Sequence, residues 1–253
     1  MFVIKEEDIQ NKQCFCILIP DDLLQLYIKR WLDDLTKTSW VEDVIEENSL
    51  FINVTFRKAI RHYISQFTTE NIASIIKTAP TYCLNLMFVM SVEDINENSE
   101  KRYECFGIVI PDDLLQQYIE RWFKSLTKTW SVEYVMCDSR LLKNIMFRNS
   151  LCNYIRQLDT EKIAALILNA DEDFINTMFV MAEQDIKDND ENRHECFGIV
   201  IPDNLLQQYM ERWFQRLTKT SDLEKFINKN RPINNVTFCI ALNEYVRQFN
   251  TEK

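Results

Sequence analysis

Few side chains in this sequence have the types and spacing that catalysis requires. Histidine occurs at His62 and His194 alone, in unrelated sequence contexts. A histidine-based triad or a His/Cys zinc site needs several such residues at short, fixed spacings, and the sequence has no CxxC or HxxxH pair. We therefore expect both histidines at the surface, no catalytic residues and no metal site.

Cofactor chemistry also lacks its usual signals. Glycine lets backbone amides approach a phosphate closely, and the sequence has two glycines, Gly107 and Gly198. Neither lies in a phosphate loop or a dinucleotide fingerprint, so we expect no cofactor. Tight packing beside a strand explains both, because they are equivalent positions 91 residues apart (198 − 107).

The eight cysteines do not suggest a disulfide framework. Cys14, Cys105 and Cys196 recur at the 91-residue offset, each directly before a phenylalanine, and no recurrent histidine could activate them as nucleophiles. We expect them in the core. Scattered thiols, together with an N-terminus unlike a signal peptide, predict a reducing, cytoplasmic compartment.

Acidic pairs are the last candidates for chemistry. Asp21-Asp22 and Asp112-Asp113 could serve a metal or an acid–base reaction, but the third occurrence reads Asp203-Asn204. The second carboxylate is therefore dispensable there, and we interpret the first as a helix N-cap. The acidic loop 185–195 lacks the central glycine of a calcium-binding loop.

The sequence repeats itself three times. Residues 19–25 read IPDDLLQ and return as IPDDLLQ at 110–116 and IPDNLLQ at 201–207, an offset of 91 (110 − 19 and 201 − 110). Solenoid repeats run to roughly 20–50 residues, whereas a unit of this size can build its own core. We predict three modules, at residues 1–86, 87–177 and 178–253.

Each module shows two apolar segments followed by amphipathic ones. In the second module, 87–90 and 105–110 are typical of strands that pair as a hairpin. Apolar residues at helical spacing then predict helices over 112–126 and 147–158, and a third helix beginning at Asp159. The predicted fold class is α+β: three ββααα modules packed rigidly in a row, because no Gly/Ser/Pro-rich linker separates them.

The third copy stops where its third helix should begin. Either the sequence is trimmed there, or that helix belongs to the joint between modules, in which case helices near 70–78 and 161–168 pack against the module that follows. Without its final helix, the exposed end of module 3 is a candidate surface for self-association.

One segment recurs more closely than the rest. Between 105–129 and 196–220 only 4 of 25 positions differ, while the following connector is rewritten. Recurring polar residues on the helix and its turn either hold neighbouring modules through salt bridges or form a patch shown three times to a partner. With two tryptophans of the connector, the candidate partner-binding residues are Gln25, Arg30, Lys37, Gln116, Arg121, Lys128, Gln207, Arg212, Lys219, Trp40 and Trp130.

Net charge and composition exclude some classes of function. The net charge of −10 disfavours direct nucleic-acid binding, and no apolar stretch is long enough for a membrane span. We therefore predict a non-catalytic tandem-repeat protein that binds a protein partner, as an inhibitor, immunity-type protein or adaptor, with avidity from its three copies. A sequence rich in Asn, Lys and Ile suggests a viral or host-associated origin.

Two other classes stay open at the sequence level. An acidic nucleic-acid mimic of the anti-restriction or anti-CRISPR type could inhibit a DNA- or RNA-processing enzyme, although the carboxylates form no ordered rows in the sequence. An enzyme with a carboxylate site in its variable loops would need acids that recur across copies, and few do.

Overall fold

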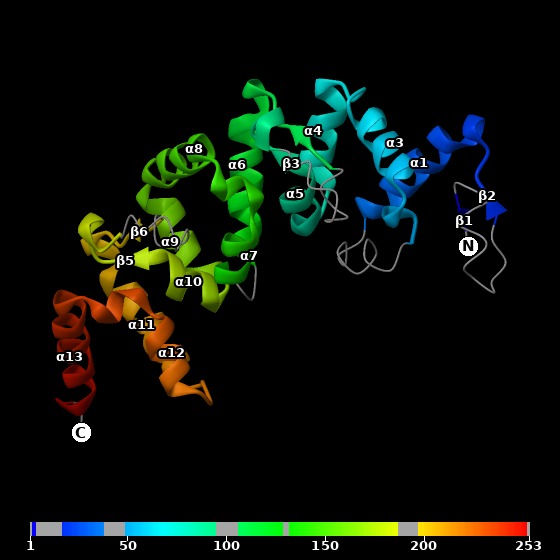
Figure 1. The fold of residues 1–253 in the computed structure, drawn as a ribbon. Helices are drawn as coiled ribbons and strands as arrows, with labels where there is room; N and C mark the ends of the chain where they lie inside the picture. The colour runs from blue at the N-terminus through cyan, green and yellow to red at the C-terminus, as the bar shows by residue number, and fades with distance from the viewer. Residues whose placement is uncertain are drawn as a thin grey trace. The chain divides into compact units, whose positions relative to one another are not determined.

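The computed structural model of the chain describes residues 2–3, 17–37, 49–94, 106–128, 132–186 and 197–251. Helices hold 74% of them (Figure 1). The chain divides into two compact units, Met1–Trp122 and Phe123–Lys253, and the boundary falls inside one helix, α6 (Asp112–Leu126). Each unit is described by itself.

The first unit is built mainly from helices. Its elements, besides the N-terminal part of α6, are β1 (Phe2–Val3), β2 (Ile17–Leu18), α1 (Asp21–Leu35), the 3-10 helix η2 (Ser49–Ile52), α3 (Val54–Ile64), α4 (Thr69–Thr78), α5 (Thr81–Met87), β3 (Phe88–Val89), the 3-10 helix η3 (Val92–Asp94) and β4 (Ile108–Val109).

Aromatic side chains form much of the core of this unit. Trp31 of α1 lies against Phe51 and Phe56, with ring centroids 5.0 and 6.3 Å apart, and stacks on Phe106 at 6.0 Å. Phe51, Phe56 and Phe106 are fully buried. Helix α1 packs on α3 across this cluster, so the predicted helical stripe of the first copy faces a core.

The second unit continues from the end of α6 with the same kinds of element. These are α7 (Val132–Asp138), the 3-10 helix η5 (Arg140–Lys143), α8 (Ile145–Arg156), α9 (Thr160–Asn169), α10 (Glu172–Met178), β5 (Phe179–Val180), the 3-10 helix η6 (Glu183–Asp185), β6 (Ile199–Val200), the 3-10 helix η8 (Asp203–Leu205), α11 (Leu206–Leu217), α12 (Leu223–Lys229), the 3-10 helix η9 (Arg231–Asn234) and α13 (Val236–Thr251).

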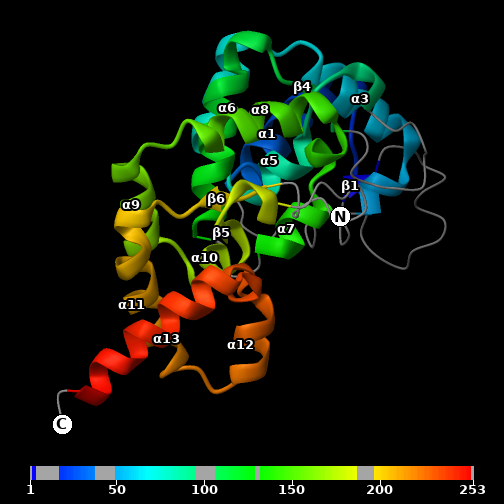
Figure 2. The ribbon, with the colours of Figure 1, turned by 90° about the vertical axis from the view of Figure 1, so that its left-hand side faces the viewer.

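Helix α11 is central to the last part of this unit. It contacts α9 and α13, and α12 and α13 follow it in the C-terminal part of the chain (Figures 1 and 2). The ring of Trp213 in α11 lies 5.5 Å from Phe226 of α12 and 5.9 Å from Phe238 of α13. One tryptophan therefore packs the three helices together.

The predicted α+β fold class is wrong, because the described part of the chain is mostly helical and its strands are two residues long. The pairs β1–β2, β3–β4 and β5–β6 are parallel, so the predicted hairpin does not form. A parallel pair needs a long crossover connection, and the polar segment between the two strands of each copy supplies one. The predicted strand at 87–90 in fact begins with the last residue of a helix, α5.

Elements recur at the offset of the sequence repeat. Helix α6 begins and ends 91 residues after α1 (112 − 21 and 126 − 35). The 3-10 helices at 49–52, 140–143 and 231–234 and the helices at 69–78 and 160–169 follow the same rule. The limits 1–86, 87–177 and 178–253 of three modules stay a prediction.

The predicted helices over 112–126, 147–158 and from 159 are confirmed as α6, α8 and α9. Asp159 caps α9 by accepting a hydrogen bond from the Lys162 amide at 2.8 Å. Asp112, in contrast, is the first residue inside α6 and not its N-cap. Its carboxylate still lies where the helix dipole favours negative charge.

An asparagine cap that the sequence analysis missed begins the second helix of every copy. Asn53, Asn144 and Asn235 precede α3, α8 and α13, and each side-chain oxygen accepts bonds from the amides two and three residues later, at 2.8–3.4 Å. Such a cap satisfies amides that have no partner inside the helix. The repeated Asn-x-x-Phe pattern is its sequence signal.

No helix within the described ranges is both long and apolar enough to span a membrane.

Candidate interaction surface

Two of the three recurring arginines, Arg121 and Arg212, contact the chain itself. Arg121 of α6 donates through Nη2 to the carbonyl of Ala79, the residue that ends α4, at 3.0 Å. Arg212 of α11 donates to the carbonyls of Ile167 and Ala170 at the end of α9. The last carbonyls of a helix have no partner inside it and carry partial negative charge, which a guanidinium neutralises. Each arginine thus caps the C-terminus of another helix.

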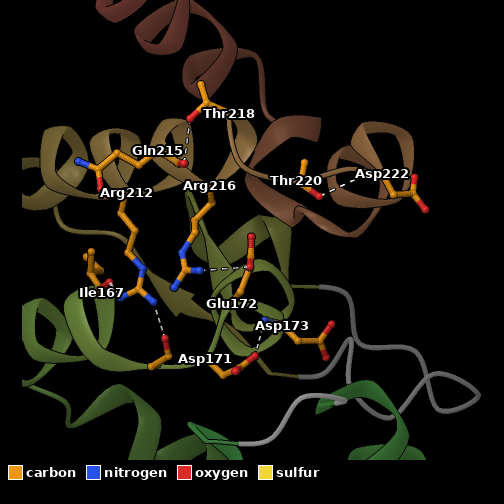
Figure 3. A network of polar contacts seen from close by, with 11 residues as sticks. Ile167, Asp171, Glu172, Asp173, Arg212, Gln215, Arg216, Thr218, Thr220 and Asp222 are labelled. Atoms are coloured by element: carbon orange, nitrogen blue, oxygen red, sulfur yellow. Dashed lines mark hydrogen bonds and ion pairs between the residues drawn. The ribbon is translucent and has the colours of Figure 1, made fainter.

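Figure 3 shows the contact in the second unit, where Arg212 and Arg216 extend from α11 toward the end of α9 and the start of α10. Arg216 forms an ion pair with Glu172 at 3.6 Å. Burial, followed by the charge of Arg216, lowers the pKa of Arg212. Its value starts so high that the guanidinium stays charged at neutral pH.

Two aromatic residues strengthen the same contact in the first unit. The hydroxyl of Tyr118 donates to the carbonyl of Leu84 at 3.0 Å, and the indole nitrogen of Trp122 donates to the side-chain oxygen of Asn85 at 2.6 Å. Both rings are fully buried, and burial raises the pKa of Tyr118. Together with Arg121, they bind α6 to the pair α4–α5.

The contact of α9 with α11 confirms the prediction that the third helix packs on the sequence that follows it. In the second unit, further polar contacts join α10 to the region of α12 and η9. The ammonium of Lys229 lies 3.0 Å from Asp173, and the amide of Asn230 donates to Asn176 at 2.9 Å. These pairs could not be expected from the repeat pattern, since the connector differs between copies.

The recurring glutamines and lysines face solvent. Gln25, Gln116 and Gln207 are exposed, and the last two donate to Glu120 and Glu211, one helical turn further on, at 3.2 Å. Lys37, Lys128 and Lys219, in the turn after the helix, are exposed as well. The predicted polar set therefore divides into two classes: Arg121 and Arg212, which cap helices, and the glutamines and lysines, which lie at the surface.

Three of the predicted residues remain. Arg30 corresponds to Arg121 and Arg212 but is exposed. Trp40 and Trp130 lie outside the described residues, as do the recurring Cys14, Cys105 and Cys196.

A groove of about 740 Å³ lies in the second unit, along α8. Arg148, Cys152 and Arg156 of α8 line it, and so do Glu183 and Gly198. Arg148 already donates to the carbonyl of Leu142 at 3.1 Å, as Arg57 does to that of Phe51 at 2.6 Å. This repeated bond secures the 3-10 turn before each helix, so the arginine has a structural role.

Nucleophilic and metal chemistry find no support among the residues that the structure describes. Cys83 is fully buried and donates through Sγ to the carbonyl of Leu35 at 3.2 Å, and burial raises the pKa of its thiol to about 12. A thiol with so high a pKa is a poor nucleophile. Within the described ranges, no three His, Cys, Asp or Glu side chains gather closely enough to hold a metal ion.

Comparison with protein-family models, curated proteins and solved structures finds no match to this chain. The function is therefore argued from the arrangement of its own residues.

Proposed function

We propose that the chain is a non-catalytic protein-binding protein, an inhibitor, immunity-type protein or adaptor, that presents one polar surface three times. We define the Gln–Lys surface as Gln25, Gln116 and Gln207 on the helices together with Lys37, Lys128 and Lys219 in the turns. The surface offers amides and ammonium groups, so it suits a partner with carboxylates and carbonyl oxygens at the contact.

The observation that carries the proposal is the division of the recurring polar residues. Two of the three recurring arginines, Arg121 and Arg212, cap helices, so internal contacts account for them. The three lysines recur although they are exposed, and among the described residues no side-chain hydrogen bond or ion pair engages them. Contacts within the chain therefore do not explain why these lysines recur in all three copies, beside a connector whose sequence differs in each copy.

Three copies on one chain favour binding through avidity. Once one Gln–Lys surface has bound, the others meet the partner at a high effective concentration, without any new kind of contact. Divergent connectors could then adapt each copy to its own part of the partner. Cys83, Cys152 and Cys239 are not in disulfides, which supports the accompanying proposal that the protein works in a reducing, cytoplasmic compartment.

The test compares two triple variants that change the net charge equally. K37E/K128E/K219E reverses the lysines of the surface, and K58E/K143E/K225E reverses one exposed, non-recurring lysine from each copy. Partners captured from a native lysate would be identified by mass spectrometry and their affinities measured with purified components. We expect the first triple variant to lose the partner, single reversals to weaken it stepwise, and the second triple variant to retain it.

Two results would contradict the proposal. An equal loss of affinity in both triple variants would show that binding depends on net charge alone and not on the Gln–Lys surface. Capture of DNA- or RNA-processing enzymes that nucleic acid displaces and salt elutes would favour an acidic nucleic-acid mimic, because such contacts weaken steeply with ionic strength.

A further inference from the structure

A pocket of about 370 Å³ lies in the first unit, between α1, α3 and α4. The structure describes every residue that lines it. Among them, Leu32 and Met87 are buried, and the rings of Tyr63 and Phe67 meet edge to face with centroids 5.5 Å apart. Ligand sites span about 300–1,000 Å³, so this pocket has room for one ring-sized group. We name it the Leu32 pocket.

In the other two copies, a phenylalanine packs against the tyrosine that corresponds to the tyrosine of the pocket. Leu32 is replaced by Phe123 in the second copy and by Phe214 in the third, at the 91-residue offset (123 − 32 and 214 − 123). The ring of Phe123 lies 5.4 Å from that of Tyr154, at an angle of 68°. The ring of Phe214 lies 6.1 Å from that of Tyr245, at 69°. The position beside this tyrosine therefore holds an aromatic ring in two copies and a leucine in the first.

A neighbouring position shows the same exchange. In the second copy Phe123 also contacts Phe174, with ring centroids 5.5 Å apart, and the residue 91 positions before Phe174 is Cys83. Phe67 offsets one of the two missing rings, because the second copy has Leu158 in its place. The second copy thus has two phenylalanines at these three positions and the first copy has one. Less aromatic volume is available to fill the first copy beside its tyrosine.

The lining residues that are exposed to solvent are polar: Lys29 and Asp33 on α1, and Gln66, Asn71 and Ser74 toward α3 and α4. Burial, followed by the negative charge of Asp33, raises the pKa of Tyr63, so this carboxylate lies near the tyrosine. A carboxylate accepts hydrogen bonds and can bind the N–H of an indole or the O–H of a phenol. An apolar interior with an acceptor at its edge suits tryptophan and tyrosine, which combine a large ring with one polar group.

The pocket is continuous with the Gln–Lys surface of the first copy. Gln25, Lys29 and Asp33 follow one another at i, i+4 spacing along α1, and all three are exposed. Thr36, which lines the pocket, directly precedes Lys37. A group bound in the pocket therefore lies beside polar side chains of that surface. Tryptophan and tyrosine are the residues that most often anchor a protein interface in such a position.

We propose that the Leu32 pocket receives the side chain of a tryptophan or tyrosine from the protein partner, with the ring against Tyr63 and its N–H or O–H donated to Asp33. That the ring belongs to a protein rests on the proposed function, whereas the capacity of the pocket for a ring does not. In the second and third copies the chain's own Phe123 and Phe214 occupy the corresponding position. The first copy therefore anchors the partner, and the three surfaces are not equivalent.

The first part of the test asks whether the pocket accepts an aromatic ring. Indole and phenol are titrated into the isotope-labelled full chain and followed by NMR, with cyclohexanol as the non-aromatic control. We expect saturable shifts of amides in α1 and α4 with indole and phenol, and weaker binding of cyclohexanol. Asp33→Ala should remove the preference for rings that carry a donor.

Matched variants locate the site. Leu32→Phe introduces the residue that the other two copies have and should weaken indole binding at least tenfold. Leu26→Phe adds the same ring at a 63% exposed position of the same helix and should leave binding unchanged. Ser74→Phe, at an exposed position of α4, obstructs the pocket from its other side and decides the question if circular dichroism shows Leu32→Phe to be misfolded. Absence of saturable shifts, or equal effects of Leu32→Phe and Leu26→Phe, overturns the proposal.

The second part asks whether a polypeptide supplies the ring. Peptides from a random displayed library are selected on the natural chain after depletion on the Leu32→Phe variant, and their affinities are measured by calorimetry. We expect the selected peptides to share one tryptophan or tyrosine, whose replacement by alanine weakens binding at least tenfold. If indole binds but no such peptide is selected, the pocket belongs to a small aromatic molecule and the claim of a partner side chain is overturned.

The lysine variant separates this proposal from the proposed function. K37E/K128E/K219E should bind indole normally, because none of these lysines lines the pocket. Loss of the partner in this variant, without any binding of indole to the natural chain, would leave the proposed function standing and refute the pocket. Binding of indole and of the selected peptides, with a partner that the lysine variant retains, would refute the Gln–Lys surface and leave the pocket standing.

Discussion

Arg212 donates to the carbonyl of Ala170, and the same bond joins Arg121 to Ala79, each partner lying 91 residues earlier (212 − 121 and 170 − 79). The arginine and the helix end that it caps therefore repeat together. In both cases the arginine caps a helix that precedes it in the sequence. This shared contact accounts for the recurrence of Arg121 and Arg212, although the connector after their helix differs between copies.

Removing this cap should destabilise the second unit. Arg212→Ala leaves the carbonyls at the end of α9 without their donor, and we expect a loss of about 2 kcal/mol of unfolding free energy, the usual range for hydrogen bonds to charged groups. Arg30→Ala, at the exposed counterpart, should cost less than about 0.5 kcal/mol. Urea unfolding followed by circular dichroism measures both, and similar losses in the two variants would contradict the capping role.

The asparagine caps give a second prediction. Asn144→Ala removes the side-chain oxygen that bonds the amides of Met146 and Phe147, and should cost about 1 kcal/mol. Asn144→Asp and Asn144→Ser keep an acceptor and serve as controls. Asn235→Ala should cost more than the loss of a cap alone, because the side-chain amide of Asn235 also donates to Asp185 at 2.8 Å. Equal unfolding midpoints for the alanine and aspartate variants at position 144 would refute the role of the cap.

How far the sequence predicts this fold depends on whether an element has a polar face. In α6, α8 and α9, apolar residues that face the core alternate with polar residues that face solvent. The sequence of these helices therefore shows a helical period. Helix α10 lacks this contrast, because all five residues from Phe174 to Met178 are buried. The polar Asn176 and Thr177 are buried with the apolar residues, so polarity does not mark a solvent-facing side, and a segment this short shows no clear helical period. This is why α5 and α10 were missed and the strands around them were overextended.

The interaction surface was predictable in part for a related reason. Recurrence identifies Arg121, Lys128 and Gln116 equally, but only the position of the end of α4 decides which of them caps a helix. That position depends on tertiary packing, which the repeat pattern does not encode. The Asn-x-x-Phe pattern at Asn53, Asn144 and Asn235 was, in contrast, a local signal that the sequence does contain.

Gly198 provides a third prediction, since a Cβ atom there would lie 2.7 Å from Cγ1 of Ile186. Gly198→Ala should therefore cost about 1–2 kcal/mol, because the isoleucine must shift in a packed region. Ile186→Ala alone removes apolar contacts, but the double variant should be more stable than the sum of the two losses implies. A double-mutant cycle in urea measures this coupling, and strictly additive losses would show that the contact does not exist in solution.

The thiol of Cys83 gives the last prediction, on pH. Its pKa is raised by burial from about 9 to about 12, so the unfolded chain releases this proton at lower pH than the folded one. The thiol contributes stability that is fully present below about pH 9 and is lost as the pH rises toward 12. Unfolding free energies measured from pH 8 to 11 should fall more steeply for the natural chain than for Cys83→Ala. Alkylation at pH 8, mapped by mass spectrometry, should modify the exposed Cys239 long before Cys83; equal rates at the two thiols would contradict the burial that raises the pKa.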